Sequence, residues 1–246
     1  MTVDFDSLLA KSPDPEICSI RLQHLLEDEC AGKTINTLPA DLLTDFFTII
    51  GTSNFLYHFL CRHPDMLSLL GEKFSIKDNE LETIEDFDAL RLFKYQQLLK
   101  LTWMDVSHKH DYSEVLDGLS ILAETIIQHS FKLALEPVNY TKACNWMTVF
   151  GLGKLGASEL NYSSDVDLIF VSANIEDTDE DINAVQSLLI DSIRKISHAI
   201  EESTSEGFLY RVDLKLRPWG SSGPLCMTLD ATENYYEASS EPWERF

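Results

Sequence analysis

Two aspartates inside a run of β-forming residues are the side chains of this sequence best placed to do chemistry. Asp165 and Asp167 lie two residues apart in GLGKLGASELNYSSDVDLIF, residues 151–170. Because residues i and i+2 of a strand point to the same face, the two carboxylates project side by side. At a separation of about 5 Å and an effective dielectric constant of about 20, their charges repel by about 3 kcal/mol. A raised pKa on one carboxyl, a basic side chain between the two, or a bound divalent cation would relieve this repulsion.

A third aspartate lies in FLYRVDLKLRP, residues 208–218, where apolar and charged residues alternate. This alternation predicts a strand with a charged row on one face. The row consists of Arg211, Asp213, Lys215 and Arg217, and the apolar face consists of Phe208, Tyr210, Val212, Leu214 and Leu216. If the two strands are neighbours, three carboxylates converge, and Mg²⁺ held by carboxylates and phosphate oxygens is the best solution. The basic residues would then face an anionic substrate, with pairing to surface acids as the alternative.

Four further D-x-D pairs, at positions 4/6, 86/88, 177/179 and 179/181, weaken the motif as a signal by itself. These pairs lie in polar or cap-like settings, where acids favour the positive end of the helix dipole. We interpret them as solvated faces or helix N-termini. Only the pair at 165/167 follows a glycine turn inside a strand-like run.

The glycine turn GLGKLG follows the apolar run WMTVF, residues 146–150. Gly151, Gly153 and Gly156 allow a tight turn and a close approach of backbone amides to a ligand. Lys154 does not stand in a G-x-x-x-x-G-K-[ST] sequence, so its spacing excludes a P-loop. The bare G-x-G-x-x-G spacing is present without an obvious ribose-binding acid, which leaves a dinucleotide site as a minor alternative.

Helical periodicity dominates the first 140 residues. It predicts helices at 14–31, ended by Gly32, and at 86–107 and 113–136. Strand signals follow, then a helix at 179–203 with Thr178 available as its cap, and a last helix from Thr228 onward. This order predicts an α+β fold with a helical region at 1–140 and a smaller strand-containing domain at 141–246.

Composition narrows the classes of partner. The chain has 246 residues, 41 of them acidic and 19 basic, and its net charge of −22 repels nucleic-acid backbones and anionic lipids. The five cysteines are scattered without a C-x-x-C pair, which favours reduced thiols. There is no basic signal segment and no apolar run of membrane-spanning length. We therefore expect a soluble cytoplasmic protein without nucleic-acid or membrane partners.

Several long stretches resemble the family of bifunctional glutamine synthetase adenylyltransferase/adenylyl-removing enzymes. They are GLGKLGASELNYSSDVDLIF, EGFLYRVDLKLRPWGSSGPL and ENYYEASSEPWERF, together with the helical LLTDFFTIIGTSNFLYHFLCRHPDML and LRLFKYQQLLKLTWMDV. The resemblance covers most of residues 40–246. ELNYSSDVDLIF and WERF are more similar to the N-terminal, adenylyl-removing half than to the C-terminal half that adds AMP.

The resemblance implies a nucleotidyltransferase-like α/β core with a mixed sheet at 141–246, incomplete at its C-terminal end. It also implies that Asp165, Asp167 and Asp213 are the catalytic groups and bind two Mg²⁺ ions. Residues implied to meet phosphate or nucleotide are Gly153, Lys154, Ser164, Arg211, Lys215 and Arg217.

The implied reaction is deadenylylation of glutamine synthetase by phosphorolysis, in which inorganic phosphate attacks the adenylyl-tyrosine bond and ADP is released. The implied partners are adenylylated glutamine synthetase, the PII signal protein and an adenine nucleotide. Three alternatives stay open: the adenylyl-transferring half, another Mg-dependent nucleotidyltransferase, and a non-catalytic docking module for glutamine synthetase or PII. Whether this truncated piece is active alone also stays open.

Overall fold

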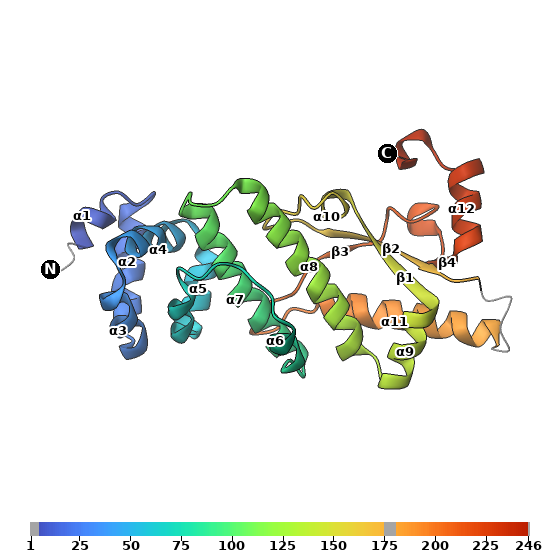
Figure 1. Ribbon diagram of the computed structural model, residues 1–246, viewed down its shortest axis with the longest axis horizontal. Coiled ribbons are helices and arrows are strands. Elements are labelled where there is room, and N and C mark those ends of the chain that lie inside the picture. The colour runs from blue at the N-terminus through green and yellow to red at the C-terminus, as the bar shows by residue number, and fades with distance from the viewer. Residues whose placement is uncertain (1–4, 175–180, 246) are drawn as a thin grey trace. The chain divides into compact units, whose positions relative to one another are not determined.

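The computed structural model describes residues 5–174 and 181–245 (Figure 1). Among these residues the chain forms two compact units. The first contains residues 5–76 and 93–118, and the second contains residues 77–92 and 119–245. Two long helices, α7 (Phe87–Val106) and α8 (Tyr112–Ala134), contribute residues to both units. They match the helices expected at 86–107 and 113–136, and the domain boundary at 140/141 stays a prediction.

The first unit is helical, as its sequence periodicity predicts. Its core consists of aromatic and aliphatic side chains with no exposed surface, among them Phe46, Phe47 and Phe59. Burial of such side chains is the main favourable term in folding. Besides parts of α7 and α8, its elements are α1 (Phe5–Leu9), α2 (Pro15–Leu26), α3 (Glu29–Thr37), α4 (Ala40–Thr52), α5 (Asn54–Arg62) and the 3₁₀ helix η1 (Pro64–Leu69).

The single helix expected at 14–31 is wrong, because the chain forms two helices there. Helix α2 ends at Leu26, and Asp28 starts α3 by accepting a hydrogen bond of 2.9 Å from the Ala31 amide. An aspartate that caps a helix offers the backbone an alternative to continuing the previous one. Gly32 consequently lies inside α3 and does not end a helix.

The second unit is built on a mixed sheet. Strand β2 (Val166–Ser172) pairs antiparallel with β1 (Met147–Leu152) along one edge and parallel with β3 (Val212–Asp213) and β4 (Cys226–Thr228) along the other. The predicted α+β class and mixed sheet are therefore confirmed. The unit's remaining elements are α6 (Asp78–Glu82), α9 (Pro137–Trp146), α10 (Gly153–Gly156), α11 (Ile182–Glu201), η3 (Gly220–Ser222), α12 (Leu229–Ala238) and η4 (Pro242–Arg245).

Strand β2 is the centre of this unit. All its side chains from Leu168 to Ser172 are buried, as expected for a strand covered on both faces. On one face Phe170 contacts Phe131 of α8, with ring centroids 6.3 Å apart. Asp167 belongs to the opposite face, because its position alternates with that of Phe170.

The long strand expected at 208–218 is wrong, since only Val212 and Asp213 join the sheet. Before them, the amides of Leu209 and Tyr210 both donate to the Ile200 carbonyl and close the end of α11. After them, the Asp213 carboxylate accepts a hydrogen bond of 2.7 Å from the Lys215 amide and turns the chain. Local bonds of this kind compete with ladder pairing, and they bury Leu209 instead of an alternating apolar row.

Helix α11 begins close to its expected start. Asp181 caps it by accepting a hydrogen bond of 3.0 Å from the Asn183 amide. The expected cap, Thr178, lies outside the described residues, as do Asp177 and Asp179. In the described part of the chain, no helix combines the length and apolar character needed to cross a bilayer.

Candidate functional site

The glycine turn after β1 brings backbone against Asp167. Gly153 has a φ of 54°, and a Cβ atom there would lie 2.6 Å from Asp167 Oδ2. A Cβ atom on Gly156 would lie 2.5 Å from the carbonyl oxygen of Gly151. Both positions require glycine, because a side chain would collide with the carboxylate or with the turn itself.

Two of the three predicted carboxylates are direct neighbours in the sheet. Asp167 and Asp213 pair in the parallel ladder of β2 and β3, where strands lie about 4.8 Å apart. Directly paired residues project to the same face. Asp165 lies just before β2, and its charge is close enough to raise the pKa of Asp167. The structure thus brings the three aspartates together at one end of two adjacent strands.

The pKa values of Asp167 and Asp213 shift in opposite directions. Partial burial raises the pKa of Asp167, and the charges of Asp213 and then Asp165 raise it further. Within the described residues, no group donates a hydrogen bond or a positive charge to the Asp167 carboxylate. The pKa of Asp213 is lowered instead, first by the backbone amide of Lys215 and then by its side chain. Asp167 is therefore the carboxylate whose charge the protein leaves least compensated.

Asp165 and Asp213 each have a cationic partner. The Arg211 guanidinium forms a short ion pair with Asp165 through Nε and donates to the Ser163 carbonyl through Nη2 at 2.6 Å. The Lys215 ammonium lies 3.1 Å from Asp213 Oδ2. Arg211 and Lys215 are both largely exposed, so they can exchange these partners for an anionic ligand.

The other predicted phosphate-binding residues have different positions. Lys154 is exposed on α10, and none of the described residues accepts a hydrogen bond from its ammonium. The Ser164 hydroxyl donates to Asn161 Oδ1. Arg217 donates to three backbone carbonyls, those of Gly223, Leu214 and Ser221 at 3.1, 2.6 and 3.1 Å, so it holds the loop after β3. The expectation that Arg211, Lys215 and Arg217 share a strand face with Asp213 is wrong, because β3 consists only of Val212 and Asp213.

Sequence reasoning missed Glu201, which helps to hold β3. Its Oε1 accepts a hydrogen bond of 3.2 Å from the Val212 amide, while the Val166 amide donates to the Arg211 carbonyl at 2.9 Å. Glu201 is the last residue of α11, and no local motif distinguishes it from the other acids of that helix.

The donor set is chemically suited to a hard cation, although the carboxylates are not arranged as its ligands in this structure. Across residues 5–174 and 181–245, no three His, Cys, Asp or Glu side chains form a cluster suited to hold a metal ion. Asp165 and Asp213 are turned to Arg211 and Lys215 instead. The raised pKa of Asp167 nevertheless marks a place where added positive charge is favoured. Oxygen donors from three carboxylates match the preference of Mg²⁺.

Comparison with known proteins gives this geometry a context. A family model described as glutamate-ammonia ligase adenylyltransferase matches residues 43–246. The chain belongs to this family. The family resemblance expected from the sequence motifs is therefore confirmed, and the matched residues include the glycine turn and all three aspartates.

The chain is also similar to individual curated proteins. The bifunctional glutamine synthetase adenylyltransferase/adenylyl-removing enzyme of Psychromonas ingrahamii is 32% identical over 238 residues, which are 86% of this chain and 25% of the relative. That of Shewanella woodyi is 31% identical over 240 residues, with the same coverage of both chains. That of Thioalkalivibrio sulfidiphilus is 37% identical over 166 residues, 64% of this chain and 17% of the relative. The chain thus spans about a quarter of the length of its first two relatives.

Proposed function

We propose that this chain carries a Mg²⁺-dependent site that removes AMP from glutamine synthetase by phosphorolysis. The observation that supports the proposal most is the pairing of Asp167 with Asp213 in adjacent strands, with Asp165 close enough to raise the pKa of Asp167 further. The relatives' names supply the reaction class and the protein substrate. The choice of the adenylyl-removing half rests on ELNYSSDVDLIF and WERF.

Asp165, Asp167 and Asp213 would hold the metal, with two ions proposed. When bound, Mg²⁺ supplies a positive charge that stabilises the developing negative charge on the transferring phosphoryl group. The chain's own cations complete the site: Arg211 and Lys215 flank Asp213 in sequence and are exposed enough to bind the anionic substrates.

In the proposed reaction an oxygen of inorganic phosphate attacks the phosphorus of the adenylyl group. The bond between that phosphorus and the tyrosine oxygen breaks, and the tyrosine oxygen keeps the electron pair and takes up a proton. The products are ADP and unmodified glutamine synthetase. No covalent intermediate on the protein is needed, so the site requires positioning and charge compensation and no nucleophilic side chain.

Further partners belong to this proposal. Adenylylated glutamine synthetase is the proposed protein substrate, PII the proposed regulatory partner, and the cytoplasm the proposed location. We do not propose a nucleic-acid partner, since the net charge of −22 opposes it.

The deciding experiment incubates adenylylated glutamine synthetase with the chain, phosphate and MgCl₂, and measures ADP. We expect the wild type to release ADP and Asp167→Asn to lower the rate of ADP release at least about a hundredfold. Removing a metal ligand should cost at least as much activity as removing a residue that hydrogen-bonds to a ligand. Asp191→Asn is the matched control, since Asp191 is an exposed acid of α11 paired only with Arg194 among the described residues.

Other products would replace the proposal with an alternative. ATP-dependent labelling of unmodified glutamine synthetase would identify the adenylyl-transferring half, and ATP consumption with a small acceptor would identify another nucleotidyltransferase. Binding of glutamine synthetase or PII without either product would identify a docking module.

A further inference from the structure

We propose that Arg91 is a positioning residue for Asp213: from the first turns of α7, it anchors the segment that carries this aspartate from α11 into the sheet. The inference rests on the proposed function for its catalytic consequence, while its structural part can be tested independently. All residues involved belong to the second unit.

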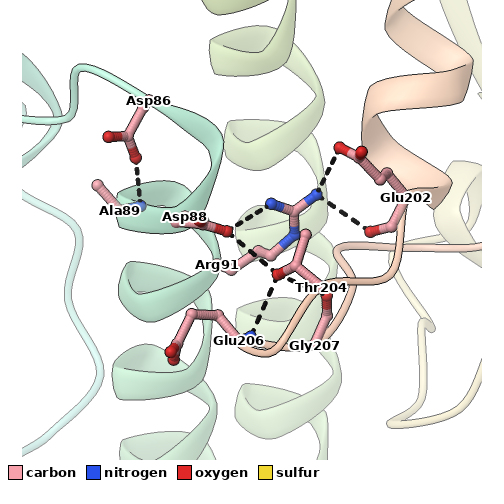
Figure 2. Close-up of polar contacts among 8 residues, drawn as sticks. All are labelled: Asp86, Asp88, Ala89, Arg91, Glu202, Thr204, Glu206 and Gly207. Carbon is pink, nitrogen blue, oxygen red and sulfur yellow. Dashed lines mark hydrogen bonds and ion pairs between the residues drawn. The ribbon is translucent and has the colours of Figure 1, made fainter.

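Arg91 is a buried cation with several acceptors (Figure 2). The residue is 1% exposed. Its Nη1 donates to Asp88 Oδ1 at 2.8 Å, and its Nη2 donates to the Glu202 carbonyl at 3.0 Å and lies 3.4 Å from Glu202 Oε2. Glu202 is the C-cap of α11, where a positive charge is favourable to the helix dipole. One guanidinium thus ties the start of α7 to the end of α11.

Asp88, which pairs with Arg91, also holds the turn that follows α11. Thr204 donates through Oγ1 to Asp88 Oδ1 at 3.1 Å, as Figure 2 shows. Thr204 and Gly207 exchange backbone hydrogen bonds of 2.9 and 3.0 Å, and the Glu206 amide donates to Thr204 Oγ1. Arg91 and Asp88 therefore fix the chain at both residue 202 and residue 204.

The acidic pair at 86/88 accordingly has two roles. Asp86 accepts a hydrogen bond of 2.8 Å from the Ala89 amide and starts α7, as expected for a helix N-terminus. Asp88 faces Arg91 and Thr204 instead. Its role goes beyond the solvated or capping one that the sequence indicates.

The position of Asp213 depends on the segment before it because β3 is very short. Only Val212 and Asp213 pair with β2, so the ladder itself gives Asp213 little support. The rest comes from the segment upstream: Leu209 and Tyr210 donate to the Ile200 carbonyl, and Val212 donates to Glu201. The acceptors of these bonds lie in the last turn of α11, next to Glu202, which Arg91 contacts. If residues 202–204 became more mobile, the segment of about ten residues that follows them would therefore hold Asp213 less firmly in place.

The test measures local order and metal affinity in the 246-residue chain. Arg91→Met removes the charge, and Arg91→Lys keeps it while a single ammonium cannot reproduce the planar fork to Asp88 and Glu202. Thr204→Val removes the hydroxyl that donates to Asp88 and accepts from the Glu206 amide, and it leaves Arg91 and Asp88 in place. Lys100→Met is the matched control, because Lys100 is another mostly buried cation of α7, paired with Glu72 at 2.9 Å in the first unit.

Amide hydrogen exchange measures how readily the pairing of β3 with β2 opens. We expect the Val166 and Val212 amides to exchange about tenfold faster in Arg91→Lys and Arg91→Met, because each loses a charge-assisted bond that limits local opening. Thr204→Val should give a smaller change in the same direction. Amides of the β1–β2 ladder should keep their rates in all three variants, and Lys100→Met should leave Val166 and Val212 unchanged.

Mn²⁺ binding followed by electron paramagnetic resonance reports the carboxylates. We expect the Kd to rise about tenfold in Arg91→Lys, the loss typical when a residue that orients metal ligands is replaced. Unchanged exchange at Val166 and Val212, or equal acceleration in the β1–β2 ladder, would overturn the proposal. A wild type that does not bind Mn²⁺ would remove the proposed metal site, while the exchange rates would still decide whether Arg91 positions β3.

Discussion

Asp167 concentrates the electrostatic problem that the D-x-D sequence poses. The protein compensates Asp165 with Arg211 and Asp213 with Lys215, and it leaves Asp167 between them with a raised pKa. Two of the three possible remedies are therefore visible in the structure, a basic partner and a favoured proton. The third, a divalent cation, is the one that the proposed function adds.

We predict that Asp167→Asn raises the melting temperature of the metal-free chain at pH 7 by about 2 °C. A carboxyl with a raised pKa holds its proton more tightly in the folded chain, so its ionisation destabilises the fold. The penalty is complete above the raised pKa and absent below the ordinary value of about 3.9, so the gain should shrink as the pH falls toward 4. Thermal unfolding from pH 7 to pH 4.5 checks this, with Asp191→Asn as the control. A lower melting temperature at pH 7 would contradict it.

Arg211 should matter for phosphate and little for stability. Its ion pair with Asp165 joins side chains that are 60% and 49% exposed, and such pairs contribute less than about 1 kcal/mol. We predict that Arg211→Gln changes the free energy of unfolding by less than that amount and raises the KM for phosphate about tenfold, through loss of a charged hydrogen bond. Lys33→Gln breaks another exposed pair, with Glu29, and should change neither quantity. Equal KM values for Arg211→Gln and wild type would exclude Arg211 from the proposed phosphate site.

At the scale of elements, the glycine turn between β1 and β2 lies against the Asp167 carboxylate. We predict that Gly156→Ala lowers the free energy of unfolding by about 2 kcal/mol or more, because the new Cβ would lie 2.5 Å from the Gly151 carbonyl oxygen. Gly51→Ala in α4 is the matched control. A Cβ there would make only ordinary contacts of 3.8 Å or longer, so helix propensity should leave stability equal or slightly higher. Urea denaturation of both variants measures the difference, and equal midpoints would show that the turn can relax.

The sequence predicts elements well where periodicity is long and poorly where local bonds compete with it. Helices α7 and α8 are 20 and 23 residues long, and their ends lie within two residues of those expected. The run at 208–218 alternates just as regularly, yet only Val212 and Asp213 form a strand. The bonds to Ile200 and from Lys215 that shorten it depend on tertiary contacts and on an aspartate turn, which alternation does not reveal.

The candidate site shows the same division. Asp165 and Asp167 could be selected from the sequence because they lie two residues apart in a run where acids are unusual, and Asp213 because it lies in a run of alternating apolar and charged residues. Arg91 could not, since it is far in sequence from Asp213 and its role depends on where α11 ends. Long-range polar contacts of this kind follow from the fold, and composition gives no signal for them.

At the scale of the whole molecule, the net charge of −22 sets the background for the site. Excess negative charge destabilises a compact chain by self-repulsion, and salt screens it over a Debye length of about 8 Å at 0.15 M. Any divalent cation will therefore stabilise this protein partly by screening alone. Binding at the three aspartates has to be separated from that general effect.

We predict that Mg²⁺ stabilises the chain beyond screening. At equal ionic strength, about 50 mM MgCl₂ should raise the melting temperature above that in about 150 mM NaCl, because a ligand that binds only the folded state adds stability by mass action. Asp167→Asn should lose most of this extra rise and keep the response to NaCl, whereas Asp191→Asn, which removes the same charge from an exposed part of α11, should keep both. Thermal unfolding of the three proteins in both salts measures the comparison. If Asp167→Asn and wild type respond equally to MgCl₂, the cation acts on the charge of the whole surface, and the three carboxylates do not form its site.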